Sequence, residues 1–226
     1  KIFFFKGKHM STIIERINKI KSNIYLLKPA RPVNIVAISK TFSLEHIRPL
    51  IDYGHEHFGE NKVQEAISKW QEEKKMNKKL KLHMVGKLQS NKAKKAVQIF
   101  DFIHSVDSQR LADILSESQE KINKSLKYFI QVNIGNEIQK SGIPANELDA
   151  FYNYCTKEKN LNILGLMIIP PNNQNTKYYF KEINHLNKSL ALGDLSMGMS
   201  ADYAEAVRNE STFVRIGSSI FGERSK

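Results

Sequence analysis

The segment Val33-Asn34-Ile35-Val36-Ala37-Ile38-Ser39-Lys40-Thr41 decides the fold of this chain. Its apolar, β-branched run predicts a buried strand over residues 33–39, of the kind found in parallel sheets that are covered on both faces. Lys40 ends that run with an ammonium group. Burial or a cationic neighbour would lower the pKa of this amine and free it to form a Schiff base with an aldehyde. The plain alternative is a strand-end lysine that reaches solvent.

Strand-like and helix-like segments alternate along the rest of the chain. Apolar or alternating runs predict seven more strands, over residues 57–59, 81–85, 102–106, 127–134, 161–169, 195–199 and 213–216. Apolar residues at helical spacing predict helices near residues 44–51, 63–70, 90–100, 111–122, 144–157, 179–190 and 201–208. An additional opening helix over residues 11–27 carries one apolar face, formed by Ile13, Ile17, Ile20 and Ile24.

Eight strands, each but the last followed by a full helix, predict an α/β fold: a single TIM-type (β/α)8 barrel with an extra N-terminal helix. A doubly wound open sheet is the alternative. It is weakened because no G-x-G-x-x-G motif follows the first strand. We expect one domain over residues 10–226, and we set residues 1–9 apart as an extension because Met10 resembles a natural start.

Composition narrows the classes of function. No apolar run reaches the length of a membrane-spanning helix. The single cysteine, Cys155, excludes an internal disulfide and fits a reducing compartment, so we expect a cytoplasmic protein.

The net charge of +12 raises the alternative of a nucleic-acid-binding module. Only seven of the 35 basic residues are Arg, however, and the lysines accompany a general bias towards Asn and Ile. No metal site is expected at His55 and His57, since no Cys or carboxylate cluster completes one.

Polar residues gather where the predicted strands end, which is where TIM-type barrels place their active sites. Lys40 follows the first strand and Asn61 the second, while Met199-Ser200 follows the seventh. Arg215 lies on the last strand, and Gly217-Ser218 follows it at a position where barrels often bind phosphate with backbone N–H groups. Ser200 could equally be a helix cap. A Schiff-base lysine and a phosphate site facing each other across one barrel mouth suggest a phosphorylated aldehyde, with pyridoxal 5′-phosphate (PLP) as the obvious candidate.

Several short motifs then carry a family likeness in order along the chain. They are Val36-Ala37-Ile38-Ser39-Lys40-Thr41, Phe58-Gly59-Glu60-Asn61, His83-Met84-Val85-Gly86, Leu88-Gln89-Ser90-Asn91-Lys92, Gln131-Val132-Asn133, Lys140-Ser141-Gly142, Gly165-Leu166-Met167, Leu195-Ser196-Met197-Gly198-Met199-Ser200 and Val214-Arg215-Ile216-Gly217. On this ordered set the chain resembles the pyridoxal phosphate homeostasis proteins, which are similar in fold to the barrel domain of bacterial alanine racemases.

The resemblance implies a cofactor site for PLP. It implies that Lys40 is the Schiff-base lysine, that Ser200, Gly217 and Ser218 hold the phosphate, and that Arg215 faces the pyridine nitrogen. Asn61 and Met199 complete the expected cofactor-binding set. Lys140 corresponds to a second lysine associated with PLP, although a solvated loop lysine is an equal alternative. Phe42 stands where bacterial members often carry Lys, and Glu210 stands where Gly is common, which leaves a turn geometry in doubt.

An arginine beside the pyridine nitrogen would donate to it and leave it unprotonated, which weakens carbanion chemistry. Alanine racemases also use a tyrosine from a second domain, and this chain has no room for such a domain. We therefore assign no catalytic residue and expect a monomeric carrier that buffers PLP for apo PLP-dependent enzymes and maintains vitamin B6 and amino-acid homeostasis. The alternative is a PLP-dependent amino-acid racemase or lyase.

Overall fold

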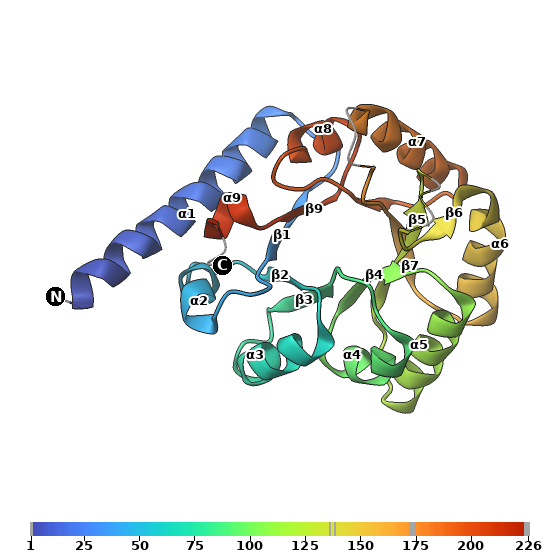
Figure 1. Cartoon of the computed structure of the whole chain (residues 1–226), viewed down its shortest axis with the longest axis horizontal. Coiled ribbons are helices and arrows are strands. Elements are labelled where there is room, and N and C mark those ends of the chain that lie inside the picture. The colour runs from blue at the N-terminus through green and yellow to red at the C-terminus, as the bar shows by residue number, and fades with distance from the viewer. Residues whose placement is uncertain (1, 136, 138, 172–174, 224–226) are drawn as a thin grey trace.

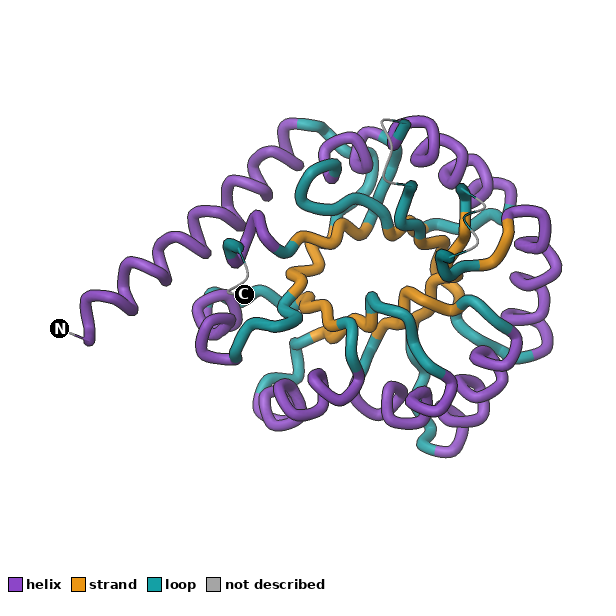
Figure 2. Tube along the Cα trace, in the orientation of Figure 1, coloured by secondary structure: helices purple, strands orange, loops and turns teal. Residues whose placement is uncertain are grey.

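The computed structural model describes residues 2–135, 137, 139–171 and 175–223. Within that part of the chain, eight parallel strands close into a barrel in the order β4-β3-β2-β1-β9-β8-β7-β5, and the β4–β5 pairing completes the ring. Figure 2 shows this ring of strands enclosed by helices. The eight are β1 (Asn34–Ile38), β2 (His57–Glu60), β3 (Lys81–Met84), β4 (Phe102–Val106), β5 (Lys127–Asn133), β7 (Ile163–Met167), β8 (Asp194–Ser196) and β9 (Phe213–Ile216). The predicted TIM-type barrel is confirmed.

Helices cover the outside of the barrel, as Figure 1 shows. They are α1 (Ile2–Leu26), α2 (Leu44–Asp52), α3 (Val63–Met76), α4 (Ala93–Ile99), α5 (Gln109–Lys121), α6 (Leu148–Asn153), α7 (Thr176–Ser189), α8 (Tyr203–Arg208) and α9 (Ser218–Phe221). Their apolar faces bury the outward-facing residues of the strands, so the strands are covered on both sides and their sequences are nearly continuous in apolar character.

Most predicted elements shift by a few residues at their ends, and three larger differences stand out. The opening helix begins at Ile2 rather than at Ser11, while its predicted isoleucine face is buried against the barrel from Ile13 to Ile24. A two-residue strand, β6 (Ile143–Pro144), pairs with β5 outside the ring; it is too short to show any alternation. The helix predicted over residues 144–157 is divided, because its last turn, Tyr154–Glu158, widens into a π-helix.

The inside of the barrel has its own apolar cluster, separate from the layer under the helices. It consists of Val36, Ile38, Phe102, Phe129, Met167 and Phe213. Side chains alternate between the two faces of a strand, so Arg215 follows Phe213 on the inner face of β9. Lys40 comes two residues after the inward-facing Ile38, just beyond the end of β1. The barrel therefore directs Arg215 into its interior and places Lys40 at the carboxyl end of β1.

A buried ion pair behind β1 fixes the strand end that carries Lys40. Glu60 Oε1 accepts hydrogen bonds from Ser39 Oγ at 2.7 Å, from Lys69 Nζ at 2.9 Å and from Trp70 Nε1 at 2.9 Å. Lys69 Nζ also donates to the Ser39 carbonyl at 2.9 Å. Glu60 is a fully buried residue at the end of β2, because its carboxylate points towards α3 rather than to solvent. Burial raises the pKa of Glu60, and the charge of Lys69 opposes that shift.

We expect Lys69→Met to lower the free energy of unfolding by about 3 kcal/mol or more at neutral pH, because it leaves a buried carboxylate without its cation. In this variant the pKa of Glu60, already raised by burial, rises further. A raised folded-state pKa favours folding at low pH and opposes it as the pH rises, so the deficit should shrink as the pH falls towards about 4. Urea unfolding at several pH values measures both effects.

The matched control is Lys75→Met, which removes a lysine from the same helix whose ion pair with Glu72 is 60% and 73% exposed. Its unfolding free energy should change by no more than about 0.5 kcal/mol. Equal losses for the two variants would show that the buried pair contributes nothing specific. A deficit for Lys69→Met that does not vary with pH would show that Glu60 is not the group left uncompensated.

Candidate functional site

Lys40 lies in a tight turn that is anchored on both sides. The turn closes with a hydrogen bond from the Phe42 N–H to the Ser39 carbonyl at 3.2 Å. Thr41 has a φ of +70°, a left-handed conformation that a β-branched residue adopts only under strain. The Thr41 N–H donates to Glu65 Oε1 at 2.7 Å, and Lys69 Nζ donates to the same oxygen at 3.0 Å. Two residues of α3, Glu65 and Lys69, therefore hold the backbone around Lys40.

Three hydrogen-bond donors meet at the turn between β9 and α9. The Ser218 hydroxyl lies 3.3 Å from Ser200 Oγ, and the Ser219 N–H lies 3.4 Å from the same oxygen. A Cβ added to Gly217 would lie 3.5 Å from the carbonyl oxygen of Ile38, so this turn packs directly against the end of β1. The structure thus brings Ser200, Gly217 and Ser218 together, as the sequence predicted.

Their place relative to Lys40 corrects one expectation. The lysine and the phosphate turn were predicted to face each other across the barrel mouth. They lie instead on neighbouring strands, since β1 pairs with β9 in the register Ala37–Ile216. Ring closure makes the first and last strands adjacent, and no local sequence pattern reports this.

Arg215 lies inside the barrel and is 5% exposed. Its Nη1 donates to the carbonyl oxygen and to Oγ of Ser196, each at 2.7 Å, and its Nη2 donates to the Ile168 carbonyl at 2.8 Å. Burial lowers the pKa of Arg215 to about 10, so the guanidinium remains a cation at neutral pH. These three bonds use three of the five N–H groups of the side chain.

Asn61 and Met199 lie at the rim of the barrel. Asn61 lines a cavity of about 520 Å³ beside the carboxyl ends of β2 and β3, together with Met84 and Gly86. Gly86 has no side chain to block this approach: a Cβ there would lie 2.6 Å from Asn61 Cβ. Met199 is 40% exposed, and its N–H donates to Asp202 Oδ1 at 2.6 Å. What Met199 offers a ligand is therefore its side chain.

Lys140 lies in the connection between β5 and β6. Its Nζ pairs with Glu137 Oε2 at 2.5 Å and contacts the Pro170 carbonyl at 3.3 Å. The ion pair lies within the loop, and the hydrogen bond to the Pro170 carbonyl connects the loop to the segment that follows β7. Neither of the two alternatives for Lys140, a cofactor-associated lysine or a loop lysine, is decided by these contacts.

Sequence reasoning missed Ser196, the residue that holds Arg215. Serine is common at strand ends, and nothing in the local pattern distinguishes this one. His83 and His104 are hydrogen-bonded residues of the barrel interior, where His83 Nδ1 lies 2.8 Å from His104 Nε2. Among the described residues, no group of His, Cys, Asp and Glu side chains is arranged to hold a metal ion.

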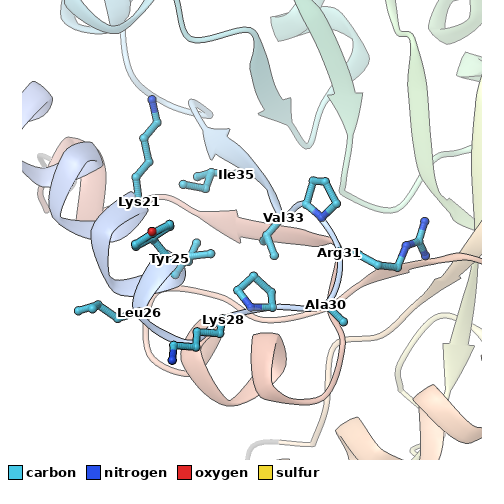
Figure 3. Close-up of a pocket in the computed structure, with 11 residues that line it drawn as sticks. Lys21, Tyr25, Leu26, Lys28, Ala30, Arg31, Val33 and Ile35 are labelled. Carbon is cyan, nitrogen blue, oxygen red and sulfur yellow. The ribbon is translucent and has the colours of Figure 1, made fainter.

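A larger cavity lies at the opposite end of the barrel. Figure 3 shows it between the end of α1 and the residues that lead into β1, with Tyr25 and Leu26 on one side and Val33 and Ile35 on the other. Its volume is about 650 Å³. It adjoins the amino end of β1, whereas Lys40 follows the carboxyl end, so it is separate from the candidate site. In the described part of the chain, no helix has both the length and the apolar character needed to cross a bilayer.

Comparison with known proteins agrees with this geometry. A family model described as "Alanine racemase, N-terminal domain" matches residues 16–225. Two curated relatives are named pyridoxal phosphate homeostasis protein. The one from Aquifex aeolicus is 34% identical over 96% of this chain and 97% of its own length, and the one from Pasteurella multocida is 36% identical over 94% and 98%.

Solved structures show the same fold. PipY of Synechococcus elongatus, determined with PLP bound, is 36% identical, has a TM-score of 0.83, and matches over 93% of this chain and 100% of its own. An alanine racemase from Clostridium difficile has a TM-score of 0.74 at 13% identity, and the match covers 57% of that enzyme's chain. At that identity the likeness shows a shared barrel and nothing further.

Proposed function

This chain belongs to the family of pyridoxal phosphate homeostasis proteins, and from that membership we propose that it binds PLP, carries and buffers it, and does so without substantial turnover of amino acids. The observation that carries the proposal is the pairing of β1 with β9, because Lys40 follows β1 and the hydroxyl-lined turn follows β9. This arrangement sets an amine next to an anion site.

The residues present fit such a cofactor. Two hydroxyls and one backbone N–H converge at Ser200, Ser218 and Ser219, and all three can donate to phosphate oxygens. When bound, PLP supplies an aldehyde that an amine attacks reversibly. Lys40 is the amine at the carboxyl end of β1, and Asn61 lines a cavity beside the carboxyl ends of β2 and β3.

Arg215 decides what chemistry the site supports. With three N–H groups committed to Ser196 and Ile168, its two remaining N–H groups can face a ring nitrogen. An arginine that is a cation at neutral pH donates a hydrogen bond and does not accept one, so it disfavours protonation of that nitrogen. A carboxylate in its place would strengthen the ring as an electron sink. The arginine therefore suits a carrier better than a racemase or lyase.

We expect Lys40→Ala to abolish the yellow colour that the wild-type protein acquires with PLP, because no amine remains beside the phosphate site. Non-covalent binding should persist through the hydroxyls, and equilibrium dialysis measures it. Lys140→Ala serves as the control and should keep the visible absorbance. A colourless wild type would contradict the proposal, as would colour that survives in Lys40→Ala and is lost in Lys140→Ala.

Ser200→Ala should lower the affinity for PLP by about tenfold to a hundredfold, because a hydrogen bond to a charged group contributes roughly 1.5–3 kcal/mol. The affinity for pyridoxal, which lacks the phosphate, should fall much less. Ser219→Ala is the matched control, since the contact of Ser219 with Ser200 uses its backbone N–H, which alanine retains. Equal losses of affinity for PLP and pyridoxal in Ser200→Ala would show that Ser200 acts only as a cap of the following helix.

The loaded protein should activate an apo PLP enzyme without turning over amino acids itself. An incoming amine can displace Lys40 by the same reversible attack, so release needs no further catalytic group. Chiral analysis of the common amino acids, incubated with purified protein, tests this. A racemase or lyase rate in the ordinary range of roughly 1–10³ per second, lost in Lys40→Ala, would favour the enzyme alternative.

We further propose a monomer in the cytoplasm. Cys155 is the single cysteine, and it is fully buried with its thiol pKa raised to about 12 by burial, so it is poorly suited to disulfide chemistry. Light scattering measures the mass of the particle and so tests the monomer.

Salt-sensitive binding to RNA or DNA at micromolar affinity would favour the nucleic-acid alternative that the charge of +12 raises.

A further inference from the structure

A chain of hydrogen bonds crosses the barrel interior and ends at Arg215. His57 Nδ1 lies 2.9 Å from His83 Nε2, and His83 Nδ1 lies 2.8 Å from His104 Nε2. His104 Nδ1 lies 2.7 Å from Ser196 Oγ, which also accepts from Arg215 Nη1 at 2.7 Å. Five strands contribute the five side chains, and the proposed function uses only the last side chain, Arg215.

We propose that His57, His83, His104 and Ser196 form a one-directional relay that positions Arg215, with His104 and Ser196 orienting the guanidinium from behind. The relay rests on the proposed function only in its purpose, which is to hold the arginine towards the cofactor ring. Its existence and direction follow from this chain alone.

The direction follows from which groups can donate. Arginine has no acceptor, so Ser196 Oγ must accept from Arg215, and its own hydroxyl proton then needs an acceptor. His104 Nδ1 at 2.7 Å fills that need, which leaves the proton of neutral His104 on Nε2. That proton is donated to His83 Nδ1, so the proton of His83 also lies on Nε2 and is donated to His57 Nδ1. All three rings therefore carry the same tautomer.

The surroundings keep the inner rings neutral. His83 and His104 are fully buried and stack on Phe102 and Phe129, with ring centroids 4.2 and 4.4 Å apart. Burial holds the pKa of both histidines well below the usual value, and the charge of Arg215 lowers that of His104 further. A neutral histidine ring has one N–H donor and one nitrogen acceptor. The donor direction set at Ser196 therefore continues through both His104 and His83.

A buried arginine needs hydrogen-bond acceptors for its charged group, and the relay supplies one of them. The hydrogen-bond partners found for Arg215 are two carbonyls and one hydroxyl, all of them neutral. Each relay donor points away from the guanidinium, so the lone pairs of Ser196 face the positive charge. This arrangement supplements the charge of Asp202, which raises the pKa of Arg215, and it fixes the guanidinium plane so that the remaining N–H groups have one direction.

The relay ends at His57, the first residue of β2, which is only partly buried. Protonated His57 would set its Nδ1–H against the Nε2–H of His83, so the relay and a proton on His57 exclude each other. Burial also lowers the pKa of His57. The other titratable groups that face it, with opposing signs, are His55, Glu56, Lys81, Asp101 and Lys127.

Nitrogen-15 NMR of the unliganded protein reads the tautomers directly. We expect His57, His83 and His104 to be protonated on Nε2 and unprotonated on Nδ1 at pH 7.5. Ser196→Ala removes the donor that sets the direction, so the pKa of His57 should rise by about half a pH unit or more. Phe129→Leu is the control: it alters the stacking on His104 but removes no hydrogen bond, and it should leave the His57 titration in place. An Nδ1-protonated ring, or a His57 titration unchanged in Ser196→Ala, would overturn the relay.

The same variants test the purpose of the relay. In Ser196→Ala the affinity for PLP should fall about threefold to tenfold, with a shift in the visible absorbance band. Phe129→Leu should show neither change. A wild type that takes up no PLP would refute the proposed function while the NMR result still decides the relay. Unchanged PLP affinity and spectrum in Ser196→Ala would show that the relay does not position Arg215.

Discussion

The two-residue alternation of β1 and β9 is the constraint on which the candidate site depends. On β1 it sends Val36 and Ile38 inward and continues to Lys40; on β9 it sends Phe213 and Arg215 inward. The two strands pair in the register Val36–Arg215. A slip of one residue would turn Lys40 towards α3 and Ser39 into the barrel. The bond from Ser39 to buried Glu60 opposes that slip, since it gives the outward side chain a partner available only on that face.

The two buried charges near this strand end are stabilised in different ways. Glu60 lies outside the ring and has a cation, Lys69, within 2.9 Å. Arg215 lies inside the ring, where its hydrogen-bond partners are carbonyls and a hydroxyl. The first arrangement gives one carboxylate oxygen, Oε1, three donors and fixes the backbone through the Ser39 carbonyl, while the buried Oε2 has no hydrogen-bond partner among the described residues. The second leaves part of the guanidinium available for a ligand, which is what a site rather than a structural ion pair requires. The strained turn at Thr41 is held by Glu65, so α3 also supports the chain beside Lys40.

Local patterns were sufficient for the barrel and for the residues that strand ends present. The apolar run before Lys40 and the motif containing Arg215 each occupy one strand and one turn, so their placement follows from strand period and barrel topology. The adjacency of Lys40 and Gly217 depends on ring closure between residues nearly the whole chain apart. The burial of Glu60 depends on a lysine and a tryptophan of the next helix, and the role of Ser196 depends on an arginine in another strand. Such contacts are made by the tertiary fold and leave no periodic signal. The start of α1 and the short β6 were missed for a simpler reason, because helix ends and two-residue strands carry little pattern of their own.

Borohydride reduction of the PLP-loaded protein, followed by mass spectrometry of its peptides, tests the central claim most directly. Reduction makes the bond between amine and cofactor permanent and so records which lysine held it. The account predicts one pyridoxyl group, on the peptide that contains Lys40. A label confined to Lys140 or to any other lysine, or no label on protein that has taken up PLP, would contradict it.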